Sequence, residues 1–206
     1  MKILKYLLLA LLLNSARAED KAEAAAAAYY NEDYATALPL YQELAAGGSE
    51  GALFRLAMMY QYGGRGLKAD YAAARDWYEK AAVAGRREAY GRVAALYKTG
   101  GPGLERNWAE AQRWYERQLA AGDPTALLQL ALLYEEGGPG TERDFARAKG
   151  YYEEFLARTG HDYGHWALGE LYSRGGPGLE KDVIQACRHF FQSKQRFNNM
   201  VRLTCF

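Results

Sequence analysis

The chain has 206 residues, of which half are hydrophobic and a quarter charged, so it is long enough to bury a substantial apolar core. Its 26 lysine and arginine residues nearly balance its 25 aspartate and glutamate residues, and the two signs are mixed along the sequence. A nucleic-acid-binding protein normally carries a concentrated basic surface, so we expect no nucleic-acid partner.

The first 18 residues have the three parts of a secretory signal peptide. Lys2 and Lys5 supply positive charge, residues 6–13 form an apolar run, and Ala16 and Ala18 are small residues at both positions that a signal peptidase reads. The run is shorter than the about 20 residues that a permanent membrane anchor needs, which argues against an uncleaved anchor. We predict cleavage after Ala18, a periplasmic or secreted protein, and no integral membrane segment after cleavage.

The next segment, residues 19–48, is expected to form a short helical hairpin. Its first helix is predicted over 24–30, and its second helix follows a compressed connection at residues 31–33. The pattern Asp-Tyr, Ala and Leu-Tyr that begins at Asp33 returns 37 residues later at Asp70 as Asp-Tyr, Ala and Trp-Tyr. This segment is therefore a shortened copy of the unit that follows it.

The phrase Tyr-x-x-Gly-Gly-x-Gly then occurs four times with a period of 37 or 38 residues. It begins at Tyr60, Tyr97, Tyr134 and Tyr172. A fixed period between about 20 and 50 residues indicates a stacked array of one small unit. Small and apolar residues at helical spacing precede each tyrosine, and we expect the first glycine to end that helix because glycine accepts positive φ.

A second helix is predicted to follow each glycine loop. The residues expected to cap its first turn are Asp70, Asn107, Asp144 and Asp182. Each helix then carries a small residue followed three and four positions later by two ring side chains, as in Ala74, Trp77 and Tyr78. Such residues share one helix face. Because they recur in register, we interpret the rings as packing residues and not as a cofactor-binding or sugar-binding surface.

The unit formed by these two helices resembles the Sel1-like repeat, a relative of the tetratricopeptide repeat. The resemblance rests on Ala-x-x-x-Leu-Ala/Gly-x-x-Tyr-x-x-Gly-Gly-x-Gly, then Asp, then Ala-x-x-Trp-Tyr. The fourth copy departs most, with Gly164 for the alanine and His189-Phe190 for Trp-Tyr. The resemblance implies an all-α fold, a right-handed α/α solenoid of tetratricopeptide/Sel1-like helical hairpins, with an adaptor or scaffold role and no catalytic residues.

We divide the chain by this register into a signal peptide, a hairpin, four repeats and a tail. The boundaries are 1–18 for the signal peptide, 19–48 for the N-terminal tetratricopeptide-like hairpin, 49–86, 87–123, 124–160 and 161–196 for the Sel1-like repeats, and 197–206 for a C-terminal capping tail. The spacing from Tyr152 to Tyr172 is one residue longer than its counterparts. We assign the extra residue to a loop within 157–163.

The chain has two cysteines, Cys187 in the fourth repeat and Cys205 in the tail. In an oxidising compartment an even pair indicates a disulfide, and the last repeat of an array needs its apolar face covered. We therefore expect the bond to hold the tail over the fourth repeat. Two free buried thiols are the alternative.

Partner binding is expected on the first helices, which line the concave face of an α-solenoid. The candidate partner-binding residues lie two positions before and after Leu56, Leu130 and Leu168, the central leucines of three first helices. They are Phe54, Met58, Leu128, Leu132, Trp166 and Glu170. Exposed apolar clusters mark interaction surfaces, and aromatic residues are typical anchors. The alternative is that these side chains are buried against an adjoining unit.

Two short patterns invite a catalytic or metal-binding interpretation, and neither is complete. His161 and His165 have the four-residue spacing of metal ligands on a helix, but they span an expected helix start and have no apparent third ligand. Lys98-Thr99-Gly100 occurs in serine β-lactamases only together with a Ser-x-x-Lys motif, which this chain lacks. We therefore predict no metal, no cofactor and no catalytic residues.

The sequence thus favours a non-catalytic periplasmic or secreted scaffold or adaptor that binds a protein or peptide partner. Two alternatives stay open. One is a cell-envelope enzyme or a carbohydrate- or peptidoglycan-binding protein that uses the aromatic side chains. The other is a secreted factor that acts on proteins of a host or of neighbouring cells.

Overall fold

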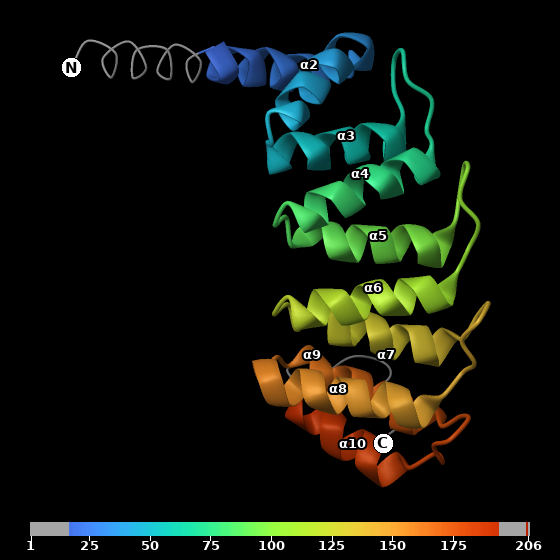
Figure 1. Cartoon of the computed structure of the whole chain (residues 1–206). Helices are drawn as coiled ribbons and strands as arrows, with labels where there is room; N and C mark the ends of the chain where they lie inside the picture. Colours follow the sequence, from blue (N-terminus) through green and yellow to red (C-terminus); the bar gives the residue numbers. More distant parts are fainter. Residues whose placement is uncertain (1–16, 194–204, 206) are drawn as a thin grey trace. The chain divides into compact units, whose positions relative to one another are not determined.

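The computed structural model describes residues 17–193 and residue 205, and over these residues the regular structure is helical apart from isolated β-bridges in the loops (Figure 1). The chain divides into two compact units, the first ending at Glu105 and the second beginning at Arg106. No helix within the described ranges is long and apolar enough to cross a membrane.

The first unit contains a helix over residues 17–30 and four labelled helices. These are α2 (Tyr34–Ala46), α3 (Glu50–Tyr62), α4 (Tyr71–Val83) and α5 (Glu88–Thr99). Consecutive helices pack on one another, and the interior is filled by small and apolar side chains such as Leu56, Met59 and Tyr78. The N-terminal helix is longer than the predicted 24–30, because residues 17–23 consist mainly of the strong helix formers arginine, alanine, glutamate and lysine.

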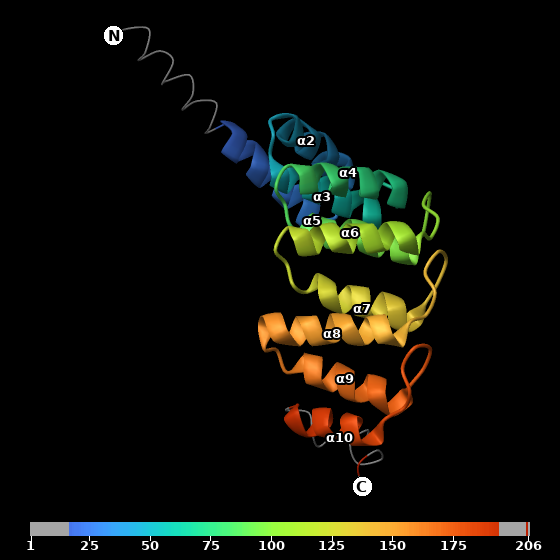
Figure 2. The same ribbon diagram turned by 60° about the horizontal axis from the view of Figure 1, so that its bottom comes forward.

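The second unit repeats this packing with five helices in its described part. These are α6 (Trp108–Ala120), α7 (Ala126–Glu136), α8 (Phe145–Thr159), α9 (Tyr163–Arg174) and α10 (Val183–Gln192), and Figure 2 shows them following one another in chain order. Buried Ala131, Tyr152 and Leu168 join α7, α8 and α9 in one cluster. The expected all-α fold of tetratricopeptide/Sel1-like hairpins is confirmed.

The first helix of each Sel1-like hairpin, α3, α5, α7 or α9, ends at a glycine, as predicted. The terminating glycines Gly63, Gly100, Gly137 and Gly175 have φ between 62 and 65°. At Gly137, φ of 62° is combined with an extended ψ of 154°, a region that is essentially restricted to glycine. The predicted turn therefore depends on glycine at this position.

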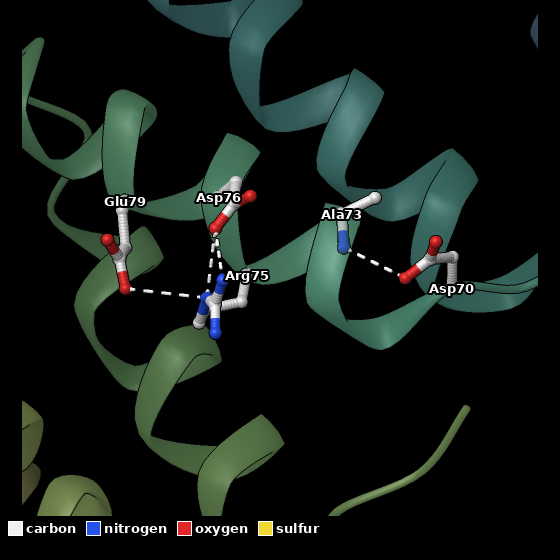
Figure 3. A network of polar contacts seen from close by, with 5 residues as sticks. All are labelled: Asp70, Ala73, Arg75, Asp76 and Glu79. Atoms are coloured by element: carbon white, nitrogen blue, oxygen red, sulfur yellow. Dashed lines mark hydrogen bonds and ion pairs between the residues drawn. The ribbon is translucent and has the colours of Figure 1, made fainter. Parts of the chain in front are cut away.

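The second helices, α4, α6, α8 and α10, begin at the four predicted caps. The side chain of each cap accepts a hydrogen bond from the backbone N–H three residues later, which satisfies one of the free donors of the first turn. In Figure 3 the Asp70 carboxylate accepts from the N–H of Ala73 at 2.9 Å. One turn further on, Arg75 pairs with Asp76 and Glu79 on the surface of α4.

Each glycine loop also contacts the hairpin that precedes it in the chain. A Cβ atom added to Gly138 would lie 2.6 Å from the indole carbons of Trp108, and the backbone N–H of Trp108 donates to the carbonyl oxygen of Pro139 at 3.2 Å. Similar ring contacts join Gly64 to Tyr34, Gly101 to Tyr71, and Gly176 to Phe145. The second glycine of the phrase therefore permits a close contact between neighbouring hairpins.

The extra residue of the third repeat is in a helix, and its assignment to a loop within 157–163 was wrong. Helix α8 has 15 residues, whereas α4 and α6 have 13. It continues through Ala157 and Arg158, which are strong helix formers, and ends at Gly160, whose φ of 60° is left-handed. The insertion thus lengthens the second helix and leaves a shorter turn before α9.

Candidate partner-binding surface

The six predicted partner-binding residues all lie on first helices, and all are half-buried. The structure separates them by unit. Phe54 and Met58 are on α3 in the first unit and form what we call the α3 patch. Helices α7 and α9 of the second unit carry the other four, which we call the α7–α9 patch: Leu128, Leu132, Trp166 and Glu170.

In the α3 patch, part of each side chain is already used in packing. The Phe54 ring meets the Tyr78 ring edge to face at 5.1 Å between centroids, and the Arg86 guanidinium lies 5.2 Å from the Phe54 centroid. The Tyr29 hydroxyl lies 4.0 Å from the Met58 sulfur. Burial against neighbouring helices therefore accounts for part of this patch, as the alternative interpretation held.

In the α7–α9 patch, Leu128 and Trp166 lie over the core of the second unit. Leu128 packs against the cluster that contains Ala131 and Leu168. The Trp166 ring lies 5.2 Å from the Phe190 ring of α10, and the two belong to a cluster that also includes Cys205. Each of these side chains rests on the interior and still keeps exposed surface, which is the arrangement of an anchored contact residue.

A buried carboxylate lies at the glycine-loop end of this patch. Glu135 is 9% exposed; its Oε1 accepts a hydrogen bond from the Tyr152 hydroxyl at 2.5 Å, and its Oε2 forms an ion pair with Arg174. The network therefore fixes the end of α7 against α8 and α9. Burial, together with the hydrogen bond to Glu135, raises the pKa of Tyr152, so this hydroxyl keeps its proton.

An equivalent bond occurs in the first unit, where the Tyr78 hydroxyl donates to Oε1 of Gln61 at 2.8 Å. In both cases a tyrosine of a second helix bonds to a residue of the preceding first helix, 17 positions earlier. Gln61 and Glu135 each follow the tyrosine of the repeated phrase by one residue, but this position does not reveal their tyrosine partners. The shared separation of 17 residues is the signal that could have identified both pairs.

Glu170 is the charged member of the α7–α9 patch. Burial raises the pKa of its carboxyl; the nearby Arg174 opposes this effect, and Glu135 adds to it. An ionised carboxylate in such a place is stabilised by an additional cationic group. The patch therefore combines apolar contact surface with a carboxylate that favours a positively charged neighbour.

The ring side chains of the second helices are mostly packing residues, as predicted. The buried members are Tyr78, Trp114, Tyr115, Tyr152 and Phe190, and the most exposed of them is Trp114 at 7%. They fill the space between hairpins and present almost no ring surface for stacking on a sugar.

The histidines do not pair as the spacing of His161 and His165 suggested. His161 is exposed, whereas Nδ1 of His165 lies 3.1 Å from Nδ1 of His189 on α10. Within the described ranges, no three or more His, Cys, Asp or Glu side chains are grouped so as to hold a metal ion.

The two cysteines are bonded to each other, as the sequence predicted. Cys187 on α10 and Cys205 form a disulfide with their Cα atoms 5.6 Å apart. The rest of the predicted capping tail, 197–204 and 206, lies outside the described residues. The domain boundaries drawn from the sequence stay predictions.

The chain matches one family model and several solved structures. No curated protein matches it. A crystal structure of a protective antigen present in uropathogenic Escherichia coli strains, which displays an SLR fold, is 30% identical with a TM-score of 0.62, and the match covers 82% of this chain and 35% of that one. A Sel1 repeat protein from Oxalobacter formigenes is 30% identical with a TM-score of 0.58, over 79% of this chain and 64% of that one. This chain thus spans less than two thirds of either protein.

A third structure, that of the MamA protein, is 17% identical with a TM-score of 0.56, over 85% of this chain and 88% of that one, and at this identity the likeness concerns the fold alone. The family model described as "Sel1 repeat" matches residues 51–85, 87–123, 124–156 and 162–194. These four matches cover well over half of the sequence and coincide with the helical hairpins described above, so the chain belongs to the Sel1 repeat family.

Proposed function

We propose that this protein is a non-catalytic scaffold or adaptor that binds a protein or peptide partner, and that it acts in the periplasm or outside the cell. Sel1 repeats commonly mediate protein–protein interactions and are generally not catalytic. The observation that carries the proposal is the α7–α9 patch, in which Leu128, Leu132 and Trp166 are half-buried on first helices and Glu170 follows Trp166 by one helical turn.

The patch supports binding for a physical reason. Leu128 and Trp166 pack on the core, so little of their side-chain freedom is lost when a partner covers their exposed part. Tryptophan in such a setting is a frequent hot spot of protein interfaces. A partner segment with apolar side chains and one lysine or arginine would match the patch, because the cation would stabilise the Glu170 carboxylate.

Capture from a cell-envelope extract tests the binding surface. We expect Leu132→Gln and Trp166→Ala to reduce partner recovery. The matched control is Val83→Gln, which also removes an apolar side chain, one that is 88% exposed on second helix α4, and it should bind normally. Trp166 contacts Phe190, so circular dichroism must first show that Trp166→Ala folds. Unchanged recovery with both patch variants would contradict the proposed surface.

The location is tested separately by the mass of the mature protein. We propose that residues 1–18 direct export, because they combine a basic start, an apolar run and small residues before the cleavage point. Intact mass of protein from periplasmic or culture-medium fractions should then correspond to a chain that begins at Glu19. Full-length protein confined to the cytoplasm would contradict export without bearing on the binding surface.

A further inference from the structure

A polar pocket of about 250 Å³ lies in the second unit, apart from the α7–α9 patch. It is formed where the glycine loop after α7 meets the first turn of α8 and the side chain of Gln112 on α6. We call it the α8 pocket. Three of its residues, Thr141, Arg143 and Arg147, carry the argument below.

Thr141 is unusual among the residues at its loop position. Each glycine loop is closed by a bridge between its second glycine and the residue three positions later, which is Leu67, Leu104 or Leu179 in the other repeats. Thr141 is only 7% exposed, and its hydroxyl is buried without a hydrogen-bond partner among the described residues. Such a group destabilises a fold, and leucine at this position would avoid the penalty. A threonine that lines a polar pocket here therefore points to a ligand.

Two guanidinium groups line the same pocket and are held by their neighbours. Nη1 of Arg147 donates to the Tyr134 hydroxyl at 3.1 Å, and Nε of Arg143 donates to the carbonyl oxygen of Glu135 at 2.9 Å. The Arg143 guanidinium also lies 5.2 Å from the centroid of the Phe145 ring. Both arginines are exposed, and because a guanidinium has five N–H donors, each keeps donors for a ligand while these contacts orient it.

The two acidic residues of the pocket differ in their availability. Asp144 uses both carboxylate oxygens: Oδ1 accepts from the backbone N–H of Arg147 at 3.0 Å, and Oδ2 lies 3.3 Å from Nε of the same residue. Glu142 is exposed. Both carboxylates oppose an anion, Asp144 less so because Arg147 partly neutralises its charge, while the Thr141 hydroxyl and the remaining guanidinium N–H groups supply donors.

We propose that the α8 pocket binds a small oxyanion, a carboxylate or a phosphate group, through the Thr141 hydroxyl and the guanidinium groups of Arg143 and Arg147. The planar guanidinium suits both anions because its parallel N–H groups match two oxygens. The hydroxyl is covered in the described conformation, so binding requires the Thr141 side chain to turn to another staggered rotamer that faces the pocket. This site is independent of the partner surface proposed above.

Titration of the ¹⁵N-labelled protein tests the proposal and identifies the anion. Sodium phosphate and sodium acetate are added separately at constant ionic strength, with sodium chloride as the control, while the Thr141 amide and the Arg147 Nε–H signals are followed. Saturable shifts at these signals with phosphate or acetate, and none with chloride, are expected. Saturation by phosphate alone assigns a phosphate site, and saturation by acetate alone assigns a carboxylate site. No saturable shift with either, or equal shifts with chloride, would overturn the proposal.

Variants separate binding from folding. Thr141→Leu restores the residue of the other repeats, so it should fold at least as stably as the wild type while the dissociation constant rises about tenfold or more. Arg147→Gln should also weaken binding, whereas Arg113→Gln removes the same charge from an exposed residue of α6 and should not. Glu142→Gln should tighten binding. Wild-type affinity in Thr141→Leu, or weaker binding in Glu142→Gln, would contradict the assignment.

Discussion

At the scale of single residues, the first two glycines of each loop have different roles, although the repeated phrase makes them look alike. The first glycine, such as Gly137, has positive φ and ends a helix. The second glycine, such as Gly138, has no such φ but lies against the ring of Trp108. The sequence predicts the first role because helix termini commonly take glycine. The second role depends on which ring of a neighbouring hairpin reaches the loop, so it became visible only in the structure.

A substitution at Gly138 tests the second role. In Gly138→Ala, the added Cβ would lie 2.6 Å from the Trp108 ring, so ring or loop must move. We expect the free energy of unfolding to fall by about 1–3 kcal/mol, measured by denaturant titration. The matched control is Gly150→Ala, in the interior of α8 with no atom within 4 Å of the added Cβ, which should gain up to about 1 kcal/mol. Equal effects of both changes would contradict a steric role.

At the scale of helices, the second helices carry buried tyrosines whose titration opposes folding at high pH. Burial raises the pKa of Tyr115 to about 12, with a smaller contribution from Glu136. Its value in the unfolded chain is about 10. The contribution of Tyr115 is therefore complete below pH about 10 and is lost as the pH rises towards 12, because the unfolded state releases its proton first.

Denaturant titrations between pH 8 and 12 measure this loss. Each buried tyrosine should lower the free energy of unfolding by about 1.4 kcal/mol per pH unit between its two pKa values. Tyr78 and Tyr152, whose pKa values are also raised by burial, add to the slope. Tyr115→Phe should reduce the dependence of the free energy of unfolding on pH by the contribution of one tyrosine, about 1.4 kcal/mol per pH unit. A slope that does not change in this variant would show that Tyr115 titrates alike in both states.

The contact between α9 and α10 should lose stability at low pH, whereas the buried tyrosines lower stability at high pH. Burial lowers the pKa of His189, and the adjacent His165 and the cations Arg188 and Lys149 act in the same sense, while Glu153 opposes them. The folded state therefore binds the proton more weakly than the unfolded chain, whose histidine pKa is about 6.5. The stability that this contact gives is present above that pH and is lost as the pH falls below it.

Hydrogen exchange of the α10 amides at pH 7 and pH 5, corrected for intrinsic rates, tests this expectation. Protection of α10 should decrease at pH 5, whereas α7 should change less. His189→Tyr introduces the residue that the third repeat carries at this position, Tyr151, and should remove most of the pH dependence. Protection that falls equally in this variant would assign the acid sensitivity to other groups.

The helices themselves were largely predictable, because each hairpin repeats its small residues, aromatics, cap and glycine in one register. The exceptions are local. Helix α8 extends through Ala157 and Arg158 because helix formers continue to Gly160, and periodicity alone does not say whether an inserted residue lengthens a helix or a loop.

The candidate surface was predictable in position but not in burial. Register places Trp166 on a first helix, where the structure has it, yet its contact with Phe190 depends on how α9 packs on α10. The bond between Tyr152 and Glu135 joins residues on different helices, and their separation of 17 positions becomes a signal only beside the equivalent pair of Tyr78 and Gln61. Thr141 carries a hydroxyl where the other repeats have leucine, and the lack of a partner for this hydroxyl among the described residues is a property of the packed loop.

At the scale of the whole molecule, stability depends on how the array ends. In a repeat protein each unit contacts only its neighbours, and a terminal unit must cover its outer face. The last described helix, α10, leaves Ile184 76% exposed and Val183 42% exposed. The disulfide links this same helix, at Cys187, to Cys205 near the end of the chain. That a tail caps this helix stays a prediction from the sequence, and the disulfide provides its test.

Reduction of the disulfide should therefore destabilise the chain locally. The bond closes a loop of 18 residues in sequence separation, for which the chain-entropy model gives about 3 kcal/mol. Because contacts in the array are between neighbours, hydrogen exchange should accelerate in α9 and α10 after reduction and stay unchanged in α3 and α4. The double variant Cys187→Ser and Cys205→Ser should behave like the reduced protein and should not respond to reductant, which separates loss of the bond from other effects of reducing conditions. Uniform acceleration in all helices would instead mean that the array unfolds as one cooperative body, and no acceleration at all would mean that the tail has no capping role.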